Sequence, residues 1–161
     1  MDKVNFVILA AGKGTRMRSA MPKVLHKLAG RSMLGHVVDA VDSLGIAQKI
    51  IVTGHGAEQV EAAFQHNTTQ FVQQTEQLGT GHAVQQAEPA LGDDATVIVL
   101  YGDVPLIRPK TIAKILDVVS STTMGLLTIH LDNPQGYGRI VRGNGDVIEA
   151  IVEQKDATAD E

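Results

Sequence analysis

The alternation of short apolar runs with segments of helical periodicity constrains the fold of this chain more than any other feature of its sequence. The apolar runs are too short for stable helices, and they predict buried strands at residues 4–10, 49–53, 70–74, 96–101 and 126–131. The intervening segments carry apolar residues three and four positions apart, and they predict helices at residues 33–44, 57–64, around 83–87 and at 109–119. This order is typical of an α/β fold with a doubly wound, Rossmann-like, mostly parallel sheet and right-handed connections.

Local signals predict several boundaries of these elements. Ser32 is a good cap for the first helix, Gly45 suits a left-handed stop after it, and Pro109 stands where the last helix can begin. Residues 11–22 hold two glycines, basic side chains and a final proline, so they predict a long loop. Residues 139–152 predict a hairpin with a Gly-Asn-Gly-Asp turn.

The composition favours a folded domain and excludes several classes of protein. With 161 residues, 43% of them hydrophobic, and a net charge of −4, the chain can form a core and lacks the signature of disorder. No apolar run reaches the roughly 18 residues that cross a bilayer, and the first residues lack the pattern of a secretion signal. The absence of cysteine excludes disulfides, thiolate chemistry and Cys-ligated zinc. We therefore expect a cytoplasmic protein with no membrane partner.

Positive charge is concentrated near the start of the sequence. Residues 1–31 contain seven basic residues and one acidic residue, a local charge of +6, so the remainder carries −10. An acidic body disfavours nucleic acid as a partner, whereas a short basic segment suits a compact, strongly anionic small molecule. Phosphates are the obvious candidates, although a solvated loop would show the same charges.

A glycine-rich segment, Leu9–Met17, follows the first expected strand. Ligands of open parallel sheets bind at the carboxyl ends of the strands, and small residues there let backbone N–H groups approach phosphate oxygens. Arg16 and Lys23 would add positive charge. A dinucleotide fingerprint needs glycine where Met17 stands, and a Walker A loop needs glycine where Val7 stands, so the segment is neither. A phosphate site and a tight turn without ligand both stay open.

Asp103 lies just past the most hydrophobic of the expected strands, after Gly102. A carboxylate at a strand end can share a hard cation such as Mg²⁺ with substrate phosphates, but Asp also favours turns beside glycine and proline. The histidines lack the spacing of a zinc site, and no serine has the flanks of a nucleophile elbow. The patterns around histidine and serine therefore disfavour nucleophilic catalysis. Asp103 is either a cation ligand or a turn residue.

Several motifs together resemble those of sugar-phosphate nucleotidyltransferases. The segment Leu9–Met17 with Pro22–Leu25 resembles the signature in which a glycine-rich loop and a following Pro-Lys meet the phosphates of a nucleotide. Further segments, Gln77–Ala83, Leu100–Leu106 and Gly136–Ile140, resemble the bacterial bifunctional N-acetylglucosamine-1-phosphate uridylyltransferase/glucosamine-1-phosphate acetyltransferase family. The resemblance spans essentially the whole chain and implies the fold of the nucleotide-diphospho-sugar transferases.

The resemblance also implies an activity and a set of site residues. The activity is Mg²⁺-dependent transfer of UMP from UTP to N-acetylglucosamine 1-phosphate, which gives UDP-N-acetylglucosamine and pyrophosphate for the bacterial cell envelope. Arg16, Lys23 and Asp103 are implied as catalytic, with Asp103 as the Mg²⁺ ligand. The implied substrate-binding residues are Leu9, Ala10, Ala11, Gly12, Lys23, Gln74, Gly79, Thr80, Tyr101, Gly102, Asp103, Gly138 and Glu153.

The family assigns these residues to different parts of the ligand. Leu9, Ala10, Ala11 and Gly12 would line the nucleotide pocket. Gln74, Gly79 and Thr80 would contact the uracil side, and Gly138 and Glu153 would face the sugar.

In this family a second metal ligand, part of the sugar pocket and a left-handed β-helix acetyltransferase domain lie beyond the position of Glu161. The resemblance therefore implies that residues 1–161 are the N-terminal portion of a nucleotidyltransferase domain, without acetyl transfer and without the homotrimer that the family builds through its β-helix. We expect little or no uridylyl transfer by this chain alone. Two alternatives stay open: a nucleotidyltransferase for another base or sugar, and a nucleotide-sugar-binding module without catalysis.

Overall fold

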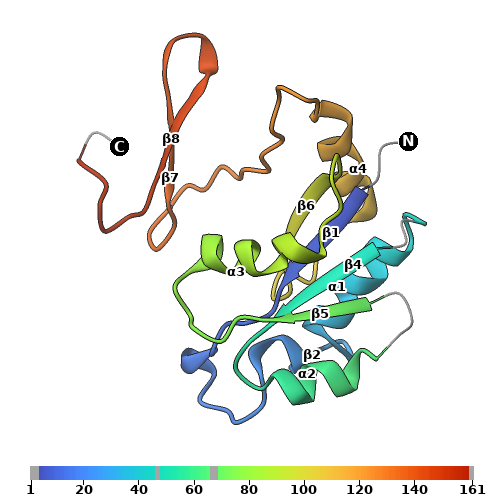
Figure 1. The fold of residues 1–161 in the computed structure, drawn as a ribbon. Helices are drawn as coiled ribbons and strands as arrows, with labels where there is room; N and C mark the ends of the chain where they lie inside the picture. The colour runs from blue at the N-terminus through green and yellow to red at the C-terminus, as the bar shows by residue number, and fades with distance from the viewer. Residues whose placement is uncertain (1–3, 46–47, 66–68, 160–161) are drawn as a thin grey trace. The chain divides into compact units, whose positions relative to one another are not determined.

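The structure is a computed structural model that describes residues 4–45, 48–65 and 69–159 (Figure 1). The chain divides into two compact units, the first up to Val119 and the second from Ser120 onward. Among the described residues, no helix is long and apolar enough to span a membrane.

The first unit is built on a four-stranded parallel sheet. Its strands are β1 (Val4–Leu9), β4 (Gln48–Thr53), β5 (Thr69–Gln73) and β6 (Thr96–Tyr101), and their order in the sheet is β5-β4-β1-β6. The chain leaves β1 toward β4 and β5 and returns on the other side of β1 at β6. This reversal of direction creates a switch point at the carboxyl ends of β1 and β6, where Leu9 lies opposite Tyr101.

Helices cover both faces of this sheet, as the periodicity predicted. They are α1 (Met33–Asp42), α2 (Ala57–Ala63), α3 (Thr80–Ala87) and α4 (Pro109–Val118). On one face Phe6 and Ile8 of β1 belong to a buried cluster with residues of α1, α2 and α4; on the other face Val7 packs with Ala83 and Ala87 of α3. Because alternate residues of a strand point to opposite faces, burial on both sides explains the continuous apolar run of β1. The doubly wound α/β fold is confirmed.

The residues expected at the helix boundaries occupy those positions. Ser32 caps α1, because its Oγ accepts a hydrogen bond from the Gly35 N–H at 3.1 Å. Gly45 adopts a φ of 68° shortly after α1 ends, and Pro109 is the first residue of α4.

The long loop after β1 contains more structure than the sequence predicted. It forms the 3₁₀ turn η1 (Thr15–Met17), and it is followed by the 3₁₀ turn η2 (Lys23–Leu25) and a short antiparallel pair, β2 (Lys27–Leu28) and β3 (Arg31–Ser32). Strands of two residues are too short for an alternating pattern to reveal.

The second unit contains the expected hairpin but not the strand expected at residues 126–131. The hairpin pairs β7 (Arg139–Arg142) with β8 (Ile148–Val152) around the expected turn. Residues 126–131 form no strand, so that prediction is wrong. They pair with no strand in the described part of the chain, and Leu127 and Ile129 are 56% and 72% exposed. An apolar run does not become a strand without a neighbour to satisfy its backbone hydrogen bonds.

Candidate functional site

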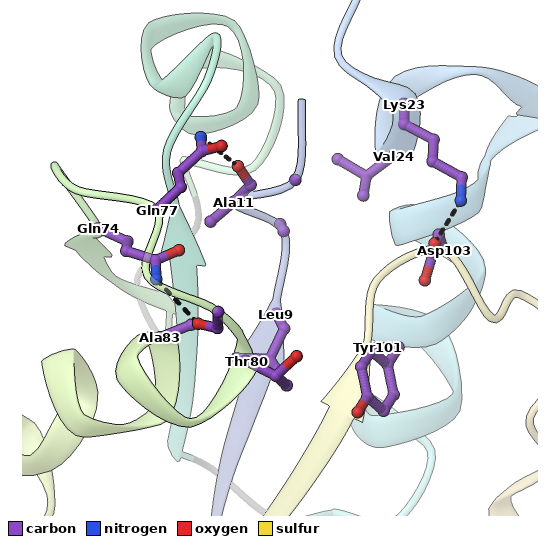
Figure 2. A pocket seen from close by; sticks show the side chains of 13 residues that line it. Leu9, Ala11, Lys23, Val24, Gln74, Gln77, Thr80, Ala83, Tyr101 and Asp103 are labelled. Atoms are coloured by element: carbon purple, nitrogen blue, oxygen red, sulfur yellow. Dashed lines mark hydrogen bonds and ion pairs between the residues drawn. The ribbon is translucent and has the colours of Figure 1, made fainter. Parts of the chain in front are cut away.

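A cavity of about 340 Å³ opens at the carboxyl ends of β1 and β6 (Figure 2). Its walls come from the loop after β1, the turn η2, the segment between β5 and α3, the start of α3 and the end of β6. The lining residues are Leu9, Ala10, Ala11, Gly12, Lys23, Val24, Gln74, Gln77, Gly79, Thr80, Ala83, Tyr101 and Asp103. Both the position and the volume of the cavity are typical of small-molecule sites in open α/β sheets.

The cavity brings together most of the residues that the family resemblance implied. Ten of them line it: Leu9, Ala10, Ala11, Gly12, Lys23, Gln74, Gly79, Thr80, Tyr101 and Asp103. Val24, Gln77 and Ala83 also line it, although the sequence assigned them no role. These three lie inside the motifs that carried the resemblance, but a motif does not reveal which of its side chains face a cavity. The part that each residue plays in binding stays a prediction.

The remaining predicted residues are not among those that line the cavity. The Gly102 N–H donates to the Leu9 carbonyl oxygen at 2.9 Å, and a Cβ at Gly102 would lie 3.0 Å from that oxygen. A side chain there would therefore push β6 away from β1. Gly138 and Glu153 belong to the second unit. The backbone of Arg16 lies in η1, but its side chain is outside the part of the structure that is described.

The glycine-rich loop is held from two sides. The Ala11 carbonyl oxygen accepts hydrogen bonds from Gln77 Nε2 at 3.0 Å and from the His55 N–H at 3.4 Å. Gly14 has a φ of 57°, and a Cβ there would lie only 2.7 Å from Lys23 Cβ. Glycine alone satisfies both the left-handed backbone and this close approach. The loop thus packs directly on the stem of Lys23 and helps to fix where its ammonium group lies.

Lys23 and Asp103 form an ion pair at the wall of the cavity (Figure 2), in which Lys23 Nζ donates to Asp103 Oδ2 at 2.6 Å. Their side chains are 40% and 32% exposed, and partly solvated pairs of this kind add only about 0–1 kcal/mol to stability. The consequence of the pair is local, since it places a cation and a carboxylate within reach of the same ligand.

Asp103 is the residue of the cavity that suits a divalent cation. Within the ranges that the structure describes, no three His, Cys, Asp or Glu side chains gather into a group that could hold a metal ion by themselves. Mg²⁺ is commonly bound by one or two carboxylates together with substrate phosphates and waters. The donor set therefore fits a cation that binds together with a phosphate ligand.

Comparison with known proteins relates the chain to nucleotidyltransferases. Residues 6–141 match the family described as the MobA-like NTP transferase domain. Over 161 residues the chain is 55% identical to the bifunctional protein GlmU of Marinobacter nauticus, in an alignment that covers 100% of this chain and 36% of that protein. The chain thus spans about a third of the length of this curated relative. The expected resemblance to the nucleotidyltransferase part of such bifunctional proteins is confirmed.

Solved structures share the fold of this chain. The structure of Rv0371c from Mycobacterium tuberculosis in complex with manganese matches with a TM-score of 0.61 and 28% identity, covering 73% of this chain and 58% of that one. A UDP-glucose pyrophosphorylase from Acinetobacter baumanii matches with a TM-score of 0.54 and 26% identity, covering 62% of this chain and 45% of that one. The nucleotide-diphospho-sugar transferase type of fold is confirmed, and one relative of that fold binds a divalent metal.

Proposed function

The chain belongs to the family of MobA-like NTP transferase domains, and on this premise we propose that its cavity forms part of a site for uridylyl transfer. The reaction joins UMP from UTP to N-acetylglucosamine 1-phosphate and releases UDP-N-acetylglucosamine and pyrophosphate, with Mg²⁺ as cofactor. Residues 1–161 then act as the N-terminal portion of a nucleotidyltransferase domain.

One observation carries the proposal. The glycine-rich loop, Lys23 and Asp103 come from separate parts of the chain, and all of them line one cavity at the switch point of the sheet. A phosphate-binding loop, a cation and a carboxylate are the groups that a metal-dependent transfer between phosphates requires. The family resemblance implies uridine and N-acetylglucosamine as the base and sugar, and the 55% identity to GlmU supports that resemblance. The UDP-glucose pyrophosphorylase of the same fold supports a uridine nucleotide.

The chemical step is a direct displacement at the α-phosphorus of UTP. An oxygen of the sugar phosphate attacks this phosphorus, the bond to the oxygen that bridges the α- and β-phosphates breaks, and pyrophosphate leaves with the electron pair. Two anions approach each other in this step, so the site must offset their repulsion. Positioning and electrostatic stabilisation are sufficient for such a transfer, and no covalent intermediate is required.

Different residues of the cavity would bind the phosphates and the metal ion. Backbone N–H groups of Ala11 and Gly12 approach the phosphates, and Lys23 neutralises their charge, with Arg16 as a second cation. Asp103 would hold Mg²⁺, which supplies charge neutralisation at the phosphate oxygens when bound. Because Lys23 pairs with Asp103 in this structure, we expect it to turn to a phosphate oxygen when the cation replaces it at the carboxylate.

Gly138 and Glu153 belong to the second unit of the chain. Gly138 and Glu153 are proposed to face the N-acetylglucosamine portion, one directly before β7 and the other directly after β8. A Cβ on Gly138 would lie 3.2 Å from the Val152 carbonyl oxygen, so glycine keeps the start of the hairpin closely paired.

Calorimetric titration of this chain with UDP-N-acetylglucosamine and Mg²⁺ tests the proposal, with GDP-mannose as the control. Selective binding of the uridine compound supports it and places the base and sugar determinants within residues 1–161. Equal binding of both compounds would contradict uridine specificity, and binding of neither would leave no support for a nucleotide-sugar site in these residues.

A second titration distinguishes an enzyme that uses UTP, as proposed, from one that uses another nucleotide. The affinities of UTP, CTP, ATP and GTP for this chain are compared by calorimetry in the presence of Mg²⁺. A preference for a nucleotide other than UTP would overturn the assignment of the base while leaving nucleotidyl transfer intact.

A further inference from the structure

A chain of hydrogen bonds links Gln74 in the wall of the cavity to His82 and Gln86 of α3. Gln74, which is only 4% exposed, donates through Nε2 to the Gly79 carbonyl oxygen at 3.1 Å. The same nitrogen lies 3.0 Å from Nδ1 of His82. The other ring nitrogen of His82, Nε2, lies 3.1 Å from the amide nitrogen Nε2 of Gln86, one turn later. Both nitrogens of the imidazole are therefore engaged.

The Gly79 carbonyl sets the direction of every bond in this chain. A carbonyl oxygen only accepts, so the Gln74 amide must turn its nitrogen toward Gly79. The second hydrogen of that nitrogen then points at His82 Nδ1, which must accept it. A neutral imidazole with an accepting Nδ1 carries its proton on Nε2, which must donate it. The Gln86 amide therefore has to turn so that its oxygen, in place of the nitrogen that lies toward Nε2, accepts this N–H. With Gln86 turned in this way, each group in the chain has a single consistent role.

This arrangement leaves Gln74 with one free polar atom. Both amide hydrogens are used inside the protein, and among the described residues none bonds to Oε1 of Gln74. Figure 2 shows the amide nitrogen on the side of the dashed bond and the oxygen on the other side. Because Gln74 lines the cavity, it presents an acceptor to the ligand and no donor.

We propose that His82 is a positioning residue that selects the base through Gln74. By holding the second amide hydrogen, His82 keeps Oε1 as the one group that Gln74 can offer to a nucleotide. Uracil carries an N–H at ring position 3, which matches an acceptor. Cytosine has a lone pair at the same position, which an acceptor repels. The inference rests on the proposed function, since it specifies how the site distinguishes two pyrimidine nucleotides of similar size.

The test compares variants that differ in what they offer to Gln74. In His82→Phe the ring is kept and the acceptor is lost, so only the Gly79 carbonyl still holds the Gln74 amide nitrogen, and the amide can turn an N–H toward cytosine at a lower cost. We expect the ratio of UTP to CTP affinity to fall by about 3- to 10-fold, the range of one neutral hydrogen bond. In His82→Asn the amide oxygen stands near the former position of Nδ1, and the ratio should return to within about twofold of the parent chain.

A matched control uses the far end of the hydrogen-bond chain. Gln86→Met removes the partner of His82 Nε2 but leaves the Nδ1 acceptor in place. It changes a residue of the same helix, one turn from His82, yet it should alter the UTP to CTP ratio by less than about twofold. A loss of selectivity in Gln86→Met equal to that in His82→Phe would overturn the proposal, because packing of α3 rather than the acceptor would then control the base.

A spectroscopic measurement keeps the inference separate from the proposed function. Nitrogen NMR of the unliganded chain reports which ring nitrogen of His82 carries the proton, and the side-chain amide signals of Gln74 report their hydrogen bonds. A proton on Nδ1 would overturn the role of His82 whatever the ligand. Unprotonated Nδ1, with Gln74 amide signals that change in His82→Phe and are restored in His82→Asn, supports it. If the chain bound neither UTP nor CTP, the proposed function would fail, and the NMR result would still decide whether His82 orients Gln74.

Discussion

Gly14 and Gly12 lie two residues apart in the same loop, and the structure predicts opposite effects for the same substitution at the two positions. Gly14 has a φ of 57°, a conformation that costs a residue with a side chain about 1–2 kcal/mol. A Cβ at Gly14 would also lie 2.7 Å from Lys23 Cβ, whereas carbon atoms pack at about 3.5–4.0 Å. The overlap of about 1 Å falls on an atom bonded to the backbone, so a side-chain rotation cannot relieve it.

The expected magnitude for Gly14→Ala combines these two costs. Overpacking of this kind typically costs about 1–3 kcal/mol, so the free energy of unfolding should fall by about 2–5 kcal/mol in total. At Gly12, by contrast, an added Cβ would meet no atom within 4 Å, and Gly12 is absent from the residues with positive φ. Gly12→Ala should leave stability unchanged or raise it by up to about 1 kcal/mol, because alanine restricts the unfolded chain.

Urea denaturation followed by circular dichroism measures both free energies of unfolding. The two variants add the same methyl group to the same loop, so their difference isolates local geometry. Equal stabilities would refute the argument, since they would mean that the loop does not pack on Lys23 as described. A stable Gly14→Ala variant that bound Mg²⁺ and UTP as the parent chain does would refute the view that this contact positions Lys23.

Further predictions concern the helix cap, the carboxylate and the chemical step. Ser32→Ala removes the acceptor for the Gly35 N–H and should lower the free energy of unfolding by about 1 kcal/mol, whereas Ser32→Asp should retain the cap; urea denaturation of both variants decides. Asp103→Asn should change stability by less than about 1 kcal/mol but abolish metal-dependent turnover in a longer chain that is active; unchanged turnover would remove Asp103 from the site. UTP with a chiral α-phosphate should react with inversion at phosphorus, and retention would indicate a covalent intermediate. Residues 1–161 should turn over weakly or not at all in a pyrophosphate-release assay, and activity equal to that of a longer relative would contradict this expectation.

The parts of the fold that the sequence predicted well are those that local chemistry determines. The run Thr96–Tyr101 became β6, which pairs with β1 and buries Ile98 and Leu100 on one face while Val97 and Val99 on the other face stay exposed. The start of α1 followed from Ser32, whose hydroxyl satisfies a backbone N–H that the helix itself leaves free. Such signals act over a few residues and are therefore visible in the sequence.

Features that depend on contacts between distant residues were not visible. The hydrogen bond from Gln77 to the Ala11 carbonyl oxygen joins residues 66 positions apart, and the spacing within either motif does not predict it. The predicted strand at residues 126–131 failed for a related reason, since periodicity describes how a strand would bury its side chains but not whether a partner strand is available. Most of the site residues proposed in the first unit line one cavity because the motifs follow strands whose carboxyl ends share one edge.

The central position of β1 determines when the site can form during synthesis. Leu9 and Tyr101 lie opposite each other in the sheet although 92 positions separate them. At translation rates of about 5–20 residues per second, the ribosome needs about 5–18 s to reach Tyr101 after it has added Leu9. Throughout that interval one edge of β1 lacks its partner, a state in which strands are prone to pair with other chains. The glycine-rich loop therefore leaves the ribosome before β6, and the cavity that it lines is completed only when β6 arrives.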